Sequence, residues 1–242
     1  MLFKKLSYAK YYAGILFRNW TGKKESYAQH GEDLLVEQLL GGIESFIDIG
    51  ANDGVLFSNT YKFAKSGACG LCVEPSPTTF LKLRLNHLFH PRVSCIRAAV
   101  SNRNGSISFI KDGYEEVLSR VSDLPIHQTV NDSSDKPTIS VPAITLEKLL
   151  FRYTHLKKVD LLSVDVEGHE KQVFEGLNDS PFQARIIVLE ADKMEIGSIL
   201  SIPFFKDYTP KYTNGVNLFL IHKSEIRKQN ENNNLPGRYV CC

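Results

Sequence analysis

The segment FIDIGANDG at 46–54 joins an apolar run, a carboxylate and a glycine-rich turn. Asp48 lies inside the apolar run, where an acid needs a partner, and Gly50, Asn52 and Gly54 follow at once. Glycines after a strand let a ligand approach the main chain closely. The turn holds no Lys or Arg to meet a pyrophosphate and is instead acidic, with Asp48 and Asp53. An acidic turn suits a ligand with a positive group, such as an ammonium or a sulfonium.

A second acid stands at the end of another apolar run. Glu74 follows CGLCV at 69–73 and lies 24 residues after Gly50. An acid at this distance from the first turn of a nucleotide-binding fold is placed to accept hydrogen bonds from a ribose diol. A ribonucleoside with a positive amino-acid tail describes S-adenosylmethionine, which is therefore the predicted cofactor.

The segment LLSVDVEGHE at 161–170 provides three candidates for catalysis: Asp165, Glu167 and His169. A carboxylate or an imidazole could remove a proton from an acceptor hydroxyl. Alternatively, Asp165 and Glu190 could hold a divalent metal ion, since hard cations prefer oxygen ligands. The structural alternatives are a helix N-cap for Asp165 and an exposed position for His169. The sequence does not decide between a base and a metal ligand.

Two further cofactor contacts are predicted away from these turns. Gln29 in SYAQHGED at 26–33 is not required for the start of a helix, and it is interpreted as part of a lid over the cofactor. The alternative is that this segment only begins a helix, with Asp33 as its cap. Ser101 ends the strand predicted over 92–101 and is expected at the same rim as the acids.

These residues need a parallel sheet to bring them together. Short apolar runs alternate with helical segments, which is typical of a parallel sheet with helices on both faces. Ligands of such sheets bind beyond the carboxyl ends of the strands, where the acids stand. The predicted strands are 45–50, 69–75, 92–101, 105–110, 158–168, 184–192 and 216–222, and the predicted helices are 33–40, 56–67, 76–89 and 169–177. Residues 138–153 are predicted to be a short strand that leads into a helix.

Five motifs in this order give the chain a family resemblance. SYAQHGED, FIDIGANDG, CVEPSP, VPAITLEKLL and LLSVDVEGHE resemble the FkbM-type class I methyltransferases over about residues 26–222. The resemblance implies a Rossmann-like fold with a mostly parallel seven-stranded sheet. It also implies methyl transfer from S-adenosylmethionine to oxygen, commonly to a sugar hydroxyl of a glycan, a glycolipid or a sugar-bearing metabolite.

The resemblance also assigns roles to single residues. It implies that Gly50, Asn52 and Gly54 form the cofactor loop with the acid Asp48. It implies that Glu74 binds the ribose and that Asp165 stands beside the reaction centre.

The resemblance divides the chain at residue 25. Residues 26–242 form the methyltransferase domain, in which 111–136 is expected to be a flap or substrate loop. Residues 1–20 place apolar side chains on one helical face, and Lys4, Lys5, Lys10 and Arg18 fall mostly elsewhere. This basic amphipathic pattern predicts contact with a membrane surface. The alternatives are packing on the chain's own domain or on a second subunit, and the Cys241–Cys242 pair is a candidate for lipidation.

Composition bounds these interpretations. The chain has 242 residues, 43% of them apolar, and a net charge of +2, which fits one medium domain and does not indicate nucleic acid as a partner. The five cysteines favour a reducing compartment, so a cytoplasmic protein with membrane association as an option is expected. Two other functions stay open: a non-catalytic module with the same fold, and a nicotinamide-dependent oxidoreductase. The absence of G-x-G-x-x-G argues against the latter.

Overall fold

A computed structural model describes residues 13–111, 120–122, 138–177, 180–190 and 196–226. Most of the predicted flap, residues 1–12 of the N-terminal segment and the Cys241–Cys242 pair lie outside the described residues. Among the described residues, none of the helices combines the length and the apolar content that a bilayer crossing needs.

The central layer is a seven-stranded sheet with the order β10-β11-β9-β8-β1-β2-β3. The pairs β1–β2, β1–β8, β2–β3 and β8–β9 are parallel, whereas β11 runs antiparallel to both β9 and β10. The prediction of a mostly parallel seven-stranded sheet is therefore confirmed. Its strands are β1 (Ser45–Ile49), β2 (Cys69–Val73), β3 (Val93–Ile96), β8 (Lys158–Val164), β9 (Gln183–Glu190), β10 (Tyr208–Thr213) and β11 (Asn217–His222).

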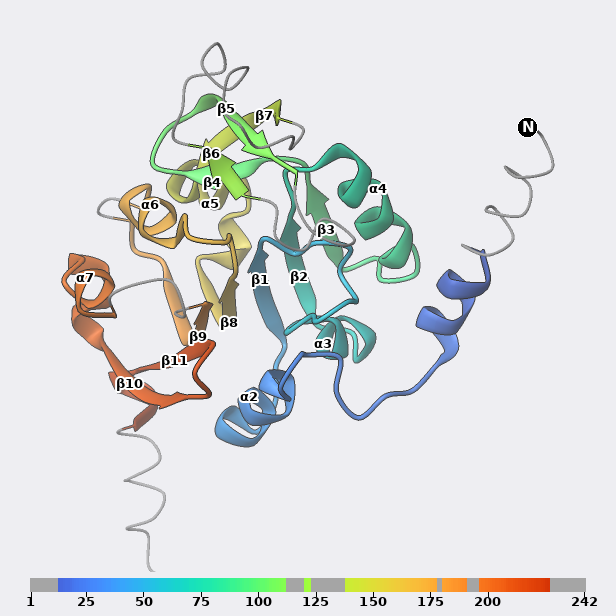
Figure 1. Cartoon of the computed structure of the whole chain (residues 1–242). Coiled ribbons are helices and arrows are strands. Elements are labelled where there is room, and N and C mark those ends of the chain that lie inside the picture. The colour runs from blue at the N-terminus through green and yellow to red at the C-terminus, as the bar shows by residue number, and fades with distance from the viewer. Residues whose placement is uncertain (1–12, 112–119, 123–137, 178–179, 191–195, 227–242) are drawn as a thin grey trace, which may run out of the picture.

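Helices cover both faces of this sheet (Figure 1). Alternate side chains of β1 enter two different cores: Phe46 packs with the helices on one face, and Ile47 with those on the other. The first face carries α2 (Glu32–Leu40), α3 (Tyr61–Lys65) and α4 (Pro77–Asn86), and the second carries α5 (Leu146–Arg152), α6 (Glu170–Glu175) and α7 (Ile196–Leu200). Two 3-10 helices, Thr154–Leu156 and Pro203–Asp207, complete the described elements of the helical layers.

A second, four-stranded sheet corrects one prediction. The strand predicted over 92–101 is two strands, because β3 ends at Ile96 and β4 begins at Ala99. The chain leaves the main sheet between them, and β4 pairs with β7 instead. No Gly or Pro marks this break in the sequence, so the apolar run reads as continuous. The order is β4-β7-β5-β6, with β4 (Ala99–Ser101), β5 (Gly105–Ile110), β6 (Arg120–Ser122) and β7 (Thr138–Thr145).

The described part of the N-terminal helix, 13–21, is fixed at its carboxyl end. Lys65 Nζ donates to the carbonyl oxygens of Asn19, Trp20 and Gly22 at 2.8, 3.1 and 2.6 Å. A cation at this end satisfies carbonyls that have no partner inside the helix, and it interacts favourably with the helix dipole. Trp20 Nε1 also donates to Asn86 O at 3.2 Å, so the segment packs against α3 and α4.

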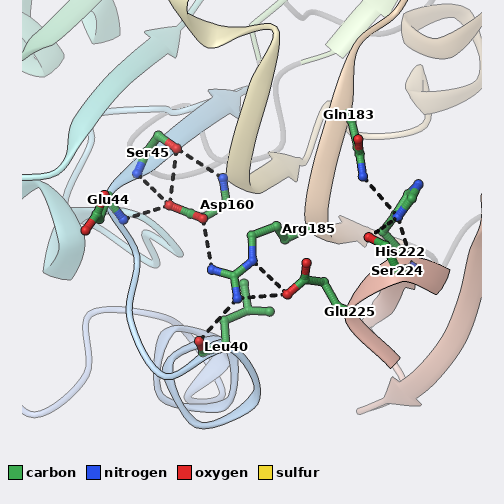
Figure 2. Close-up of polar contacts among 9 residues, drawn as sticks. All are labelled: Leu40, Glu44, Ser45, Asp160, Gln183, Arg185, His222, Ser224 and Glu225. Carbon is green, nitrogen blue, oxygen red and sulfur yellow. Dashed lines mark hydrogen bonds and ion pairs between the residues drawn. The ribbon is translucent and has the colours of Figure 1, made fainter. Parts of the chain in front are cut away.

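A polar network ties together the amino ends of the central strands (Figure 2). Arg185 of β9 pairs with Asp160 of β8 at 3.0 Å and with Glu225 at 2.9 Å. Asp160 Oδ2 accepts from the main-chain nitrogens of Glu44 and Ser45 at 2.8 and 3.0 Å, just where β1 begins. Arg185 thus holds β8 and β9 in register near their amino ends. The acidic residues predicted for the site lie at the opposite, carboxyl ends of the strands.

The network generates a stability prediction. Arg185→Met keeps the aliphatic stem but leaves Asp160 and Glu225 without their cation, although their side chains are only 15% and 7% exposed. Because the Arg185 side chain is itself 33% exposed, we expect the free energy of unfolding to fall by about 2–3 kcal/mol, less than for a fully buried pair. Urea unfolding measures this loss.

Lys62→Met is the matched control, since Lys62 pairs with Glu37, whose side chain is 50% exposed. This change should lower the free energy of unfolding by no more than about 1 kcal/mol. Equal losses in the two variants would contradict the role given to Arg185.

Candidate active site

A cavity of about 320 Å³ opens beyond the carboxyl ends of β1, β2, β8 and β9. No Lys, Arg or His is among the described residues that line it. Its wall is therefore strongly negative, which favours a ligand that carries a positive charge. The acidic residues of the wall are Glu32, Asp48, Glu74, Asp165, Glu167 and Glu190.

Gly50 lies at the floor of this cavity, at a position where a residue with a side chain would not fit. Its φ is +85°, and a Cβ atom would lie 1.7 Å from the carbonyl oxygen of Asp165. A main-chain hydrogen bond from Asp165 N to Ile49 O at 3.0 Å holds the ends of β1 and β8 at this approach, and a bond from Gly50 N to Val73 O at 2.9 Å joins Gly50 to β2. The predicted glycine turn therefore brings the main chain after β1 into close contact with the main chain after β8 at the cavity.

Asn52 and Gly54 have different positions in the same turn. Asn52 lines the cavity with a φ of +49°. Its Oδ1 is buried, and no described group donates a hydrogen bond to it. Gly54 does not line the cavity; a Cβ there would lie 2.6 Å from Leu83 Cδ1 and 2.8 Å from His87 Nε2. The structure therefore explains Gly54 by the close packing of the turn on α4.

Asp48 is buried at the base of the cavity. Its Oδ2 accepts a hydrogen bond from Thr60 Oγ1 at 2.6 Å. Burial raises the pKa of Asp48 from 3.8 to about 6, and hydrogen bonds from Thr60 and Ser163 oppose this increase. Since Asp48 alternates with Ile47 and Ile49, its side chain lies on the α3 face of the sheet, where Thr60 precedes the helix.

Glu74 follows β2 at the cavity wall and is 6% exposed. Its Oε1 accepts a hydrogen bond from the main-chain nitrogen of Ser76 at 2.7 Å. This bond fixes the carboxylate at the rim. Because a carboxylate can accept about four hydrogen bonds, its orientation does not prevent it from binding hydroxyl donors in the cavity.

Asp165, Glu167 and Glu190 meet in one acidic cluster beyond β8 and β9. Each offers a carboxylate oxygen within 4.8 Å of the other two. The pKa of Asp165 is raised, chiefly because protein surrounds it and next because Glu167 is negative; a hydrogen bond with Glu190 opposes the increase. The Asp165 side chain is nevertheless exposed, so solvent screens this effect in part.

His169 and Ser101 lie outside the cavity lining. Both are buried, and Ser101 Oγ lies 3.0 Å from His169 Nε2. This contact joins the residue before α6 to the end of β4. The structure therefore brings the two residues together, and neither is among the described residues that line the cavity.

The predicted lid segment does reach the site. Gln29 lines the cavity, and the neighbouring Ala28 forms a parallel bridge with Phe57. Glu32 Oε1 accepts from Asn217 Nδ2 at 2.9 Å, and Oε2 accepts from His30 N at 2.8 Å. The lid segment is therefore tied to the start of β11 and to the loop after β1.

The residues of this wall that sequence reasoning missed include Phe57, Asn59 and Asn217. Among the described residues other than glycine, the only ones with positive φ are Asn52, Phe57 and Glu167, and all three line the cavity. Strained backbone of this kind concentrates at functional sites. A polar residue that begins the apolar run at 217–222 could have pointed to Asn217, whereas nothing in the sequence marks Phe57.

The seven-stranded sheet, its two helical layers and the cavity at the carboxyl strand ends define a Rossmann-like class I methyltransferase fold. The family model for the methyltransferase FkbM domain matches residues 48–211, which is more than half of the chain. The chain therefore belongs to the FkbM methyltransferase family. Among curated proteins, none matches it.

Solved structures resemble the chain only distantly. The methyltransferase FkbM from Methylobacillus flagellatus KT is 12% identical, with a TM-score of 0.45, over 74% of this chain and 44% of that one. This chain thus spans less than half of that protein. A methyltransferase from Geobacter sulfurreducens is 11% identical, with a TM-score of 0.45, over 88% and 87% of the two chains. A precorrin-6y C5,15-methyltransferase from Geobacter metallireducens GS-15 is 12% identical, with a TM-score of 0.42, over 83% and 92%.

The raised pKa of Asp48 predicts how stability depends on pH. Between pH 3.8 and about 6 the folded protein keeps a proton that the unfolded chain releases, so the free energy of unfolding falls as pH rises. Asp48→Asn removes this fall. At pH 7.5 the variant should be more stable than the wild type, by up to about 3 kcal/mol, and the difference should vanish near pH 4. Thermal melts across this range measure it.

Asp207→Asn, at an exposed acid outside the site, is the control. It should show no pH-dependent difference from the wild type. A lower melting temperature for Asp48→Asn at pH 7.5 would mean that the carboxylate stabilises the fold.

Proposed function

We propose that the protein is an S-adenosylmethionine-dependent O-methyltransferase that acts on a sugar hydroxyl of a glycan, a glycolipid or a sugar-bearing metabolite. The observation that carries this proposal is the cavity wall with six carboxylates and no basic residue among those described. A nucleotide with phosphates would be repelled by such a wall. A nucleoside with an ammonium and a sulfonium is attracted to it.

Three features of the cavity fit S-adenosylmethionine. Glu74 stands at the end of β2, where an acid binds ribose hydroxyls in related nucleotide folds. The buried Oδ1 of Asn52, which lacks a described donor, offers an acceptor to an ammonium group. Gly50 leaves the main chain open to a ligand at the end of β1. When bound, S-adenosylmethionine supplies an activated, electrophilic methyl group.

We assign to Asp165 the removal of the proton from the acceptor hydroxyl. Its raised pKa is nearer to neutral pH than that of an ordinary carboxylate, which suits a general base. Glu190 hydrogen-bonds to Asp165 and orients it. Glu167 is negative and adjacent, so it favours the protonated form of Asp165 once the proton has been taken.

The sugar acceptor is supported by the family resemblance and by the amide side chains of the wall. Gln29, Asn59 and Asn217 line the cavity together with the carboxylates. Amides both donate and accept hydrogen bonds, which matches the hydroxyl groups of a sugar.

The first test concerns cofactor binding. Glu74→Ala removes the proposed ribose acceptor, and a hydrogen bond to a charged group contributes about 1.5–3 kcal/mol. We therefore expect the affinity for S-adenosylmethionine, measured by isothermal titration, to fall at least about ten-fold. Glu44→Ala, at an exposed acid, should bind like the wild type. An unchanged affinity in folded Glu74→Ala would refute the ribose assignment, and tight binding of NAD by the wild type would refute the cofactor.

The second test concerns chemistry. Asp165→Asn keeps the shape of the side chain and removes the base, so turnover should fall by about 10²-fold or more while S-adenosylmethionine affinity changes little. Methyl transfer by the wild type should also rise with pH as Asp165 loses its proton. Transfer of a labelled methyl group to lipid-linked and soluble glycans measures both.

A chelator separates the base from a metal ligand. The three carboxylates of the acidic cluster are the donors that a divalent cation would need. If Asp165 is the base, EDTA leaves turnover unchanged. Loss of activity with EDTA and recovery with Mg²⁺ would instead assign the cluster to a metal ion, and wild-type turnover in Asp165→Asn would exclude both roles.

A further inference from the structure

An apolar stripe lies exposed along α4 and the turn that follows it. Leu81, Leu85, Leu88 and Phe89 are 59%, 39%, 60% and 63% exposed. Leu81 and Leu85 are one helical turn apart on α4, and Leu88 and Phe89 lie in the turn that follows the helix. Leu83, by contrast, is fully buried and joins α4 to the core. The four residues therefore form an apolar stripe on α4 and its following turn that the described residues leave exposed.

The N-terminal helix extends this stripe. The rings of Trp20 and Phe89 lie 4.4 Å apart in an edge-to-face contact, and Asn19 Nδ2 donates to Asn86 Oδ1 at 3.0 Å. Phe17 lies one helical turn before Trp20 and is 64% exposed. The helix at 13–21 thus ends against the carboxyl end of α4, and both elements present large apolar side chains to solvent.

Positive charge is concentrated in the parts of the sequence that contain these two elements. Residues 1–24 and 75–111 contain six basic residues each and no acid, which leaves 17 basic residues against all 27 acidic ones in the rest of the chain. Arg84 and Arg92 are exposed on or beside α4, and Arg18 is exposed on the N-terminal helix. Although the net charge is only +2, basic and acidic residues are strongly segregated along the sequence. The basic residues are Lys4, Lys5, Lys10, Arg18, Lys23, Lys24, Lys82, Arg84, Arg92, Arg97, Arg103 and Lys111.

We propose that the α4 stripe and the helix at 13–21 together form a docking surface for an anionic lipid bilayer. Large apolar side chains that are flanked by Lys and Arg are the pattern of a segment that lies in the membrane interface. The leucines and phenylalanines enter the acyl boundary, and the basic residues meet the anionic headgroups.

Two other occupants fit this surface less well. A second copy of the chain would bring two basic faces together, and like charges oppose that contact. A nucleic acid would satisfy the basic residues but would leave the leucine stripe in water. A bilayer satisfies both the charge and the apolar area.

The test is sedimentation of the full chain with vesicles of two compositions, phosphatidylcholine alone and phosphatidylcholine with about 30% phosphatidylserine. The wild type should partition at least about ten-fold more strongly onto the anionic vesicles, and raising the salt from about 0.05 to about 0.5 M should weaken binding. Leu81→Gln/Leu88→Gln removes apolar contact without changing charge, and binding should fall at least about five-fold. Arg84→Glu should weaken binding to anionic vesicles as well.

Matched controls lie on α5. Phe151 is 77% exposed, and Arg152 is exposed beside it, so Phe151→Gln and Arg152→Glu should bind vesicles like the wild type. The proposal is overturned if Leu81→Gln/Leu88→Gln binds as the wild type does, or if both vesicle compositions bind equally. It is also overturned if the wild type dimerises without lipid and the double variant does not, because a second copy would then cover the stripe.

Discussion

Just beyond β1 and β8, the main chains lie so close together that a Cβ atom on Gly50 would be 1.7 Å from the carbonyl oxygen of Asp165. The rest of the site depends on this close approach. It fixes Asp48, two residues before Gly50, at the base of the cavity and Asp165 at its side, while the bond from Gly50 N to Val73 O places Glu74 at the next strand end. Three acids that are far apart in the sequence are positioned by the register of one parallel sheet.

Crowding these acids has an electrostatic consequence. Burial raises the pKa of Asp48, and burial together with the charge of Glu167 raises the pKa of Asp165. A negative wall without a described basic residue destabilises the fold, and a positive ligand would relieve that repulsion. In the proposed function, the feature that weakens the fold is therefore the one that selects a cationic cofactor. The network of Arg185, at the opposite strand ends, helps to hold the register against this repulsion.

Much of the fold and of the acidic wall could be predicted from the sequence. Continuous apolar runs identified β1, β2, β8 and β9, and an acid at the end of such a run has few positions other than the ligand rim. The positions that the sequence did not indicate depend on tertiary contacts. Ser101 Oγ and His169 Nε2 lie 3.0 Å apart. The spacing of the two residues in the sequence does not indicate this contact, because the predicted strand over 92–101 is broken where β4 joins a second sheet. Phe57 reaches the wall only because its backbone adopts a positive φ and bridges to Ala28.

Amide hydrogen exchange of the full chain with and without S-adenosylmethionine tests the central claim most directly, because it reports where the cofactor binds without requiring the acceptor. The account predicts slower exchange in 49–59, 74–76 and 165–167, the segments that carry the cavity wall. Exchange at the amino ends of the strands, around Asp160 and Arg185, should stay the same. Protection confined to those amino ends, or no protection with saturating S-adenosylmethionine, would contradict the account.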